Sequence, residues 1–106
     1  MFLFRLCYNL SMNTDKSLLF FYGFDCPHCV LVEKYVDTLI EEGFDIKKLE
    51  VWNNKENDSL MVELDKGENM CGGVPFFINQ ITGKTICGEA TYKELKKWAQ
   101  GVQKNS

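Results

Sequence analysis

The stretch Phe24-Asp25-Cys26-Pro27-His28-Cys29 follows the apolar run Leu18-Leu19-Phe20-Phe21-Tyr22 and precedes a segment with helical periodicity. An apolar run of this length is typical of a central strand covered on both faces. A Cys-x-x-Cys pair between such a strand and a helix is typical of thiol redox sites, because unpaired N–H groups and the dipole at the helix N-terminus favour a thiolate. The sequence therefore predicts a redox dithiol at this junction.

Each residue of this motif has an expected role. Cys26 is expected at the helix start with its sulfur exposed, and Cys29, three residues on, on the same face within bridging reach. Pro27 fits the first helical turn, where a missing N–H costs nothing. His28, the only histidine of the chain, would add a proton donor and a positive charge beside the sulfurs. These four residues form the predicted catalytic centre, with an exposed histidine of no function as the alternative for His28.

The same spacing also forms half of a zinc site. The other cysteines, Cys7, Cys71 and Cys87, form no second Cys-x-x-Cys pair, and the chain has no second histidine. Redox chemistry is therefore favoured, and no bound metal is expected. The alternative is a binding protein in which the pair holds zinc, copper or a bridging iron–sulfur cluster.

The composition bounds the class of protein. With 106 residues, 45% of them hydrophobic and 25% charged, the chain is long enough for one globular domain with its own core. The net charge of −3 gives no reason to expect nucleic acid or a membrane as partner. Five cysteines at irregular spacing argue against a secreted disulfide framework. A cytoplasmic protein with mostly reduced thiols is expected.

Residues 1–16 are expected to form an N-terminal extension before a domain that spans residues 17–103. The first ten residues are apolar but interrupted by Arg5, and they are too short to span a bilayer and unlike a signal peptide. A loose extension or an extra edge strand would explain them. Targeting to an organelle is the alternative, because the stretch has an arginine and no acid before Asp15.

The rest of the chain predicts alternating strands and helices. In the second, weaker helix, Leu60, Met61 and Leu64 are the expected inner stripe. The expected elements are a strand at 18–24, a helix at 30–42, a strand at 46–52, a helix at 55–66, strands at 74–79 and 84–87, and a helix capped by Thr91. This order implies an α/β fold, β-α-β-α-β-β-α, with a four-stranded mixed sheet and helices on both faces.

Two motifs placed in this order carry a resemblance to a known superfamily. With Cys26-Pro27-His28-Cys29 at the first strand–helix junction and Val74-Pro75 opening the third strand, the chain resembles the thioredoxin superfold over about residues 17–100. Its length is closest to the small glutaredoxin-like version. In that superfamily the proline is cis and faces the redox pair, so the resemblance implies that Val74 and Pro75 bind the substrate. An X-Pro bond by itself is cis in only about one case in twenty.

The features of the subfamilies are mixed. Glutaredoxins resemble this chain in Cys-Pro-aromatic-Cys and in the Val-Pro step, and their glutathione-binding acidic turn is loosely matched by Gly88-Glu89-Ala90-Thr91. Thioredoxins usually have Trp-Cys-Gly-Pro-Cys, and a buried Asp where Phe20 stands here. Cys-Pro-His-Cys is typical of strongly oxidising disulfide catalysts of the bacterial periplasm, but their large inserted helical domain is absent.

The resemblance implies thiol–disulfide exchange. Cys26 as thiolate would attack a disulfide of a protein or a glutathione mixed disulfide, and Cys29 would then release the product and close the bond between the two cysteines. No tightly bound cofactor is expected. Glutathione would be a co-substrate, and either glutathione or a reductase would supply the electrons.

The remaining cysteines are harder to assign. Cys71 lies four residues before Pro75, so it is a candidate auxiliary thiol: a second resolving cysteine, a glutathionylation site or a third metal ligand. A small buried core cysteine is the favoured alternative for Cys71 and for Cys87. Cys7 is given no role.

Overall fold

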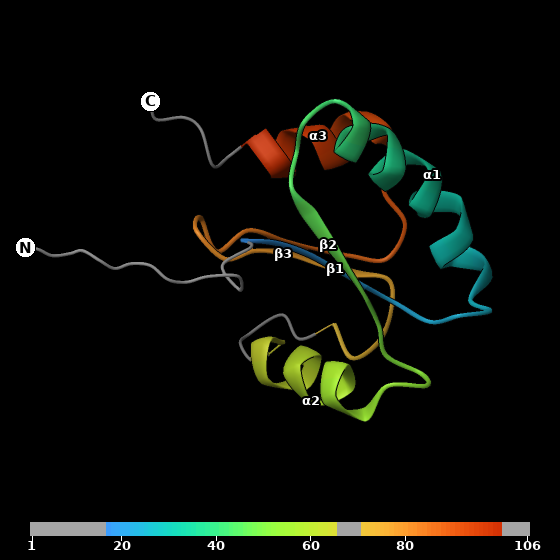
Figure 1. Cartoon of the computed structure of the whole chain (residues 1–106). Helices are drawn as coiled ribbons and strands as arrows, with labels where there is room; N and C mark the ends of the chain where they lie inside the picture. Colours follow the sequence, from blue (N-terminus) through green and yellow to red (C-terminus); the bar gives the residue numbers. More distant parts are fainter. Residues whose placement is uncertain (1–16, 66–70, 101–106) are drawn as a thin grey trace, which may run out of the picture.

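The elements follow the order predicted from the sequence, β-α-β-α-β-β-α. Figure 1 shows them along the chain. They are β1 (Leu18–Tyr22), α1 (Pro27–Glu41), β2 (Ile46–Glu50), α2 (Lys55–Leu64), β3 (Phe76–Asn79), β4 (Thr85–Cys87) and α3 (Tyr92–Gln100).

The computed structural model describes residues 17–65 and 71–100. The predictions for residues 1–16, for Cys7 and for the last three residues of the expected domain lie outside the described residues. Within them, none of the helices has the length and the apolar run that crossing a membrane requires.

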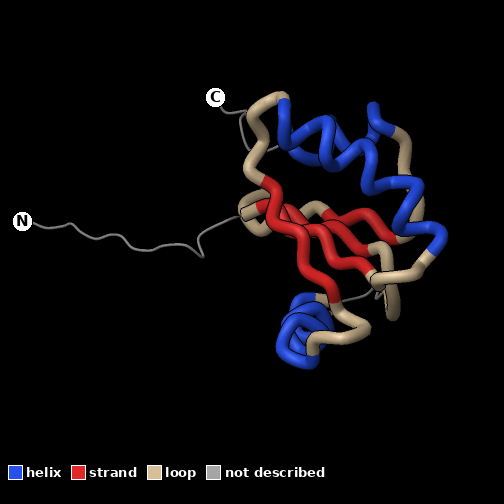
Figure 2. Tube along the Cα trace, turned by 45° about the vertical axis from the view of Figure 1, so that its right-hand side comes forward, coloured by secondary structure: helices blue, strands red, loops and turns tan. Residues whose placement is uncertain are grey.

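The four strands form one mixed sheet in the order β2-β1-β3-β4. β1 pairs with β2 in parallel, and the β1–β3 and β3–β4 pairs are antiparallel. Helices α1 and α3 cover one face of this sheet and α2 covers the other (Figures 1 and 2). The chain therefore has a thioredoxin-like fold, and the predicted architecture is confirmed.

The central strand β1 explains the continuous apolar run of the sequence. Leu18 and Phe20 pack into the core beneath α1 and α3, whereas Leu19 and Phe21 pack into the core beneath α2. Successive side chains of a strand point to opposite faces, so a strand covered on both faces is apolar at every position. Phe20 is fully buried and stacks on Phe77, with ring centroids 4.8 Å apart.

Several local predictions need correction. Helix α1 begins at Pro27 rather than at Val30, because the helix starts at its capping position and not at its first apolar residue. The third strand begins at Phe76 rather than at Val74. Leu60 is exposed, and Met61 and Leu64 make the contacts of α2 with the core, because α2 turns only a narrow stripe towards the sheet.

The cap of the last helix is confirmed. The Thr91 hydroxyl accepts a hydrogen bond from the Glu94 N–H at 3.1 Å, and the Glu94 carboxylate accepts one from the Thr91 N–H at 2.9 Å. This reciprocal capping box satisfies two backbone donors and fixes the start of α3.

Candidate redox site

The strand register brings the predicted site residues to one end of the sheet. Phe21 of β1 lies opposite Phe76 of β3, so the chain beyond β1 passes beside Pro75, which precedes β3. Phe76 in turn lies opposite Cys87, the last residue of β4. The Cys-x-x-Cys motif after β1, the Val-Pro step before β3 and the end of β4 therefore meet at this end.

Cys26 is the N-cap residue of α1, and Pro27 occupies the first helical turn as predicted. The Cys26 N–H donates to the Gly23 carbonyl at 3.1 Å, and the Cys29 N–H donates to the Cys26 carbonyl at 3.0 Å. Both cysteines are free thiols, and the residues are only 4% and 2% exposed. The prediction of an exposed Cys26 sulfur is wrong, because the turn closed by the Gly23 carbonyl holds the capping residue against the protein.

The environment of Cys29 keeps it protonated. Burial raises the pKa of the Cys29 thiol from 9.0 to about 12. A backbone hydrogen bond from Gly23 opposes this rise, whereas the hydrogen bond with the Cys26 side chain and the negative charge of Glu33 add to it. At neutral pH Cys29 is therefore a thiol that interacts directly with the sulfur of Cys26.

The imidazole of His28 contacts a carboxylate from a distant part of the chain. Its Nδ1 lies 2.5 Å from Oε2 of Glu89, in the loop between β4 and α3. Both side chains are exposed. Glu89 belongs to the four-residue stretch that only loosely matches a glutathione-binding turn, and in this structure its carboxylate faces the redox motif instead. No sequence signal connects two residues 61 positions apart.

Glu50 is a site residue that the sequence did not reveal. It is the last residue of β2, beside Tyr22, and its carboxylate accepts hydrogen bonds from the N–H groups of Phe24 at 2.9 Å, Trp52 at 3.1 Å and Asn53 at 2.8 Å. Desolvation raises the pKa of Glu50, but these backbone donors outweigh it and the pKa is lowered. A charged carboxylate therefore ties the loop before Cys26 to the end of the neighbouring strand.

An exposed apolar surface lies beside the motif. Phe24 is 68% exposed and Trp52 is 57% exposed. The indole of Trp52 lies so close to Gly23 that a Cβ atom at this position would be 2.4 Å from two ring carbons. Gly23 is therefore required for the indole to lie against the loop that leads to Cys26. We call Phe24 and Trp52 the aromatic pair.

The Val74-Pro75 peptide bond is cis, as the resemblance implied. Pro75 is fully buried, and its carbonyl accepts the N–H of Gly88 at 2.9 Å. Val74 is half-buried and packs against the core beneath α2. The structure thus places both residues at the end of the sheet that carries the motif.

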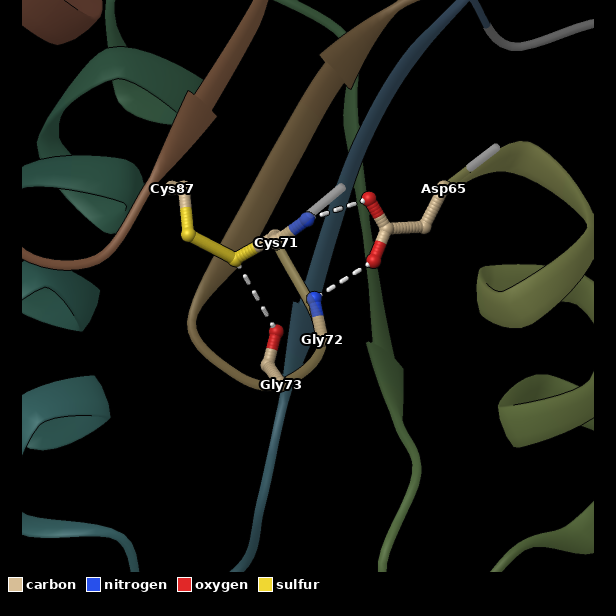
Figure 3. Close-up of a disulfide and its surroundings, with 5 residues drawn as sticks. All are labelled: Asp65, Cys71, Gly72, Gly73 and Cys87. Carbon is tan, nitrogen blue, oxygen red and sulfur yellow. Dashed lines mark hydrogen bonds between the residues drawn. A yellow bond between two sulfur atoms is a disulfide. The ribbon is translucent and has the colours of Figure 1, made fainter. Parts of the chain in front are cut away.

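Cys71 and Cys87 form a disulfide bond (Figure 3). Cys71 is half-buried and Cys87 is exposed, so the prediction that both are core cysteines is wrong. The prediction of mostly reduced thiols is also wrong for this pair, and in this structure Cys71 is not a free auxiliary thiol. Cysteine spacing alone could not show the pairing, because it depends on how the loop before β3 crosses to the edge strand β4.

Within residues 17–65 and 71–100, no group of three or more His, Cys, Asp or Glu side chains is arranged to hold a metal ion. The Cys26–Cys29 pair offers two sulfur ligands. A structural zinc site needs four. In the described part of the chain, the pair therefore has no third ligand beside it.

The chain matches no protein-family model, and no curated protein is significantly similar to it. The thioredoxin-like fold with a cysteine pair at the start of α1 is thus established by its architecture and geometry.

Proposed function

We propose that the protein is a small, glutaredoxin-like thiol–disulfide oxidoreductase in which Cys26 attacks and Cys29 resolves. The observation that carries the proposal is the pair of free thiols at the N-terminus of α1, on a thioredoxin-like fold. A helix N-terminus favours an anion, which supports a thiolate at the capping residue Cys26. Cys29, whose pKa burial raises to about 12, is the proton-bearing partner.

The reaction proceeds in two exchanges. The Cys26 thiolate attacks one sulfur of the substrate disulfide, the other sulfur leaves as a thiolate, and a mixed disulfide with Cys26 forms. The departing thiolate takes up a proton, for which Cys29 of the same motif is the proposed donor. Cys29 then attacks the Cys26 sulfur, the reduced substrate leaves, and the Cys26–Cys29 disulfide closes with two electrons transferred.

The surroundings of the motif suggest how a substrate would be held. An extended segment that carries a disulfide could pair with the backbone at Val74 in the manner of an added strand. The aromatic pair, Phe24 and Trp52, would contact apolar side chains of that segment, since both are exposed beside the loop before Cys26. Glutathione or a reductase is the proposed electron donor, and a glutathione mixed disulfide is an alternative substrate.

The decisive test is to trap the mixed disulfide. In Cys29→Ser the second exchange is blocked, so Cys26 should remain covalently bound to the substrate, and mass spectrometry should locate the bond at Cys26. The matched control is Cys26→Ser, which should form no adduct at this site. An adduct that forms equally well in both variants would refute the assignment of Cys26 as the attacking thiol.

The competing function is metal binding by the same two thiols. Since the described residues supply no third ligand, the further ligands would have to come from elsewhere, for example from a second copy of the chain or a small thiol. Metal analysis and an absorbance spectrum of protein purified without oxygen separate the two functions. Stoichiometric iron or zinc that is lost in Cys26→Ser would replace the proposed function.

A further inference from the structure

The Cys71–Cys87 disulfide lies close in the chain to the His28–Glu89 contact of the redox motif. Cys87 ends β4, and Glu89, two residues on, pairs with His28. Between them, the Gly88 N–H donates to the Pro75 carbonyl at 2.9 Å. Two residues and one side-chain contact therefore connect the disulfide to the histidine between the two redox cysteines.

One end of this disulfide is firmly anchored. The buried carboxylate of Asp65, at the end of α2, accepts hydrogen bonds from the N–H groups of Cys71 at 2.8 Å and Gly72 at 2.7 Å (Figure 3). Both oxygens of a carboxylate thus hold successive backbone donors, a charge-assisted arrangement. Cys71 is fixed to the α2 side of the molecule whether or not its sulfur is bonded.

The other end is weakly held. Among the described strands, β4 is an edge strand that has three residues and pairs with β3 alone, and both Thr85 and Cys87 are exposed. Short edge strands with exposed side chains have little burial to stabilise them. The disulfide therefore ties the end of a weak strand, and with it the start of the loop that carries Glu89, to the anchor at Asp65.

The two cysteine pairs belong to elements on opposite faces of the sheet. Cys71 packs against the core beneath α2, whereas α1, which carries Cys26 and Cys29, packs on the opposite face of the sheet. The register agrees, since Cys87 is paired with Phe76, whose side chain also belongs to the α2 side. Coupling between the pairs must therefore run through the backbone and the Glu89–His28 contact, not through direct sulfur exchange.

We propose that Cys71–Cys87 is a second, regulatory redox site whose bond holds Glu89 on His28 and whose reduction releases it. The inference rests on the proposed function in taking Cys26 as the attacking thiol. The partner of this site is a dithiol reductant. With the bond closed, the Glu89 carboxylate keeps a negative charge beside the motif. With the bond open, that negative charge moves away from the motif and Cys26 becomes more reactive towards an electrophile.

The switch itself is an ordinary exchange. A thiolate of the reductant attacks the exposed Cys87 sulfur, the bond between Cys71 and Cys87 breaks, and Cys71 leaves as a thiolate that takes a proton from water. The second thiol of the reductant, as thiolate, attacks the reductant's own sulfur in the mixed disulfide. This step releases Cys87 and completes the transfer of two electrons.

The experiment measures the alkylation of Cys26 and not its turnover. In a Cys7→Ser, Cys29→Ser chain, Cys26 is the only free thiol while Cys71–Cys87 stays bonded. The rate with iodoacetamide at pH 6 is compared with that of the same chain carrying Cys71→Ser and Cys87→Ser. We expect the rate to rise about two- to five-fold without the disulfide, the range that an exposed ion pair contributes.

Glu89→Gln tests the route. With the disulfide intact, this variant should show the same rise, and removing the disulfide as well should add nothing. Glu41→Gln, at the far end of α1, is the matched control and should leave the rate unchanged. Equal rates with and without the disulfide would overturn the proposal. A rise that persists in full in Glu89→Gln would overturn the role of Glu89.

A second measurement does not depend on the variant that lacks the disulfide. His28 is the only histidine, so its Hε1 ring proton gives one NMR signal that can be assigned without ambiguity. Adding a phosphine reductant to the Cys7→Ser, Cys29→Ser chain should shift this signal while circular dichroism stays unchanged. A signal that does not move on full reduction would overturn the coupling. These readouts are independent of disulfide turnover, so failure of the proposed function would appear only in the trapping experiment.

Discussion

Cys26 and Cys29 are three positions apart at the start of α1, whereas Cys71 and Cys87 are 16 positions apart and join a loop to the edge strand β4. By the chain-entropy estimate, a bond between residues three apart constrains the unfolded chain by about 2 kcal/mol, and a 16-residue loop by about 3 kcal/mol. The first pair lies buried at a helix start, whereas the second pair includes one exposed residue, Cys87. Because all four residues are cysteines, the different roles proposed for the two pairs rest on their positions in the fold and not on residue type.

The largest expected difference is in catalysis. Cys26→Ser should lower the reduction of a protein disulfide by at least about 100-fold, because the nucleophile is lost. The double variant Cys71→Ser, Cys87→Ser should stay within about five-fold of the unmodified protein, since neither sulfur faces the motif. Insulin reduction measured for both variants checks the pair of outcomes. Loss of activity in the second variant while it remains folded would contradict the proposed difference in catalytic role between the two pairs.

For stability, removing Cys71–Cys87 should have the larger effect and changing Cys26 the smaller one. Opening Cys71–Cys87 should lower the free energy of unfolding by about 3 kcal/mol, because the closed loop of 16 residues constrains the unfolded chain. Urea unfolding of Cys71→Ser, Cys87→Ser gives this difference. The control is Cys26→Ser, in which both thiols of the motif start unbonded and the expected change is about 1 kcal/mol. Equal losses in the two variants would contradict the comparison.

The two cysteine pairs should also differ in how they affect the free energy of unfolding at alkaline pH. Because burial raises the pKa of Cys29 from 9.0 to about 12, the unfolded chain loses this proton at lower pH than the folded chain does. The contribution of Cys29 is fully present below about pH 9 and is lost as pH rises towards 12, with a slope of at most about 1.4 kcal/mol per pH unit. Urea unfolding between pH 8 and 10 tests this, and Cys29→Ser should remove that part of the slope. A slope unchanged in the variant would contradict it.

The smallest effect is expected from substituting a glycine near each cysteine pair: Gly23 before Cys26, and Gly73 after Cys71. A methyl group in Gly23→Ala would meet the Trp52 ring at 2.4 Å, so the exposed indole should move away. We expect the free energy of unfolding to change by less than about 1 kcal/mol, while KM for a protein disulfide rises several-fold. Tryptophan fluorescence and steady-state kinetics measure both. Gly73→Ala is the control, since a Cβ there meets nothing within 4 Å. The same KM in both variants would remove the aromatic pair from substrate binding.

Much of the fold could be predicted because its signals are local. The apolar run of β1, the capping box at Thr91 and the Cys-x-x-Cys spacing each depend on residues within one or two turns of one another. The resemblance added the cis bond at Pro75, which local chemistry alone would not indicate. Element boundaries were less accurate, as at Pro27 and Phe76, because apolar periodicity does not mark where backbone hydrogen bonding begins.

The sequence by itself thus determined the order of elements, the sheet and the position of the Cys26–Cys29 pair. Only the tertiary structure decided the environment of that pair. The hydrogen bond from the Phe24 N–H to the Glu50 carboxylate joins residues 26 positions apart, and the Glu89–His28 contact joins residues 61 positions apart. The Cys71–Cys87 bond and the burial of Cys26 also belong to this second group. The physical reason is that such contacts depend on strand register and loop path, which bring distant residues together only after the sheet has formed.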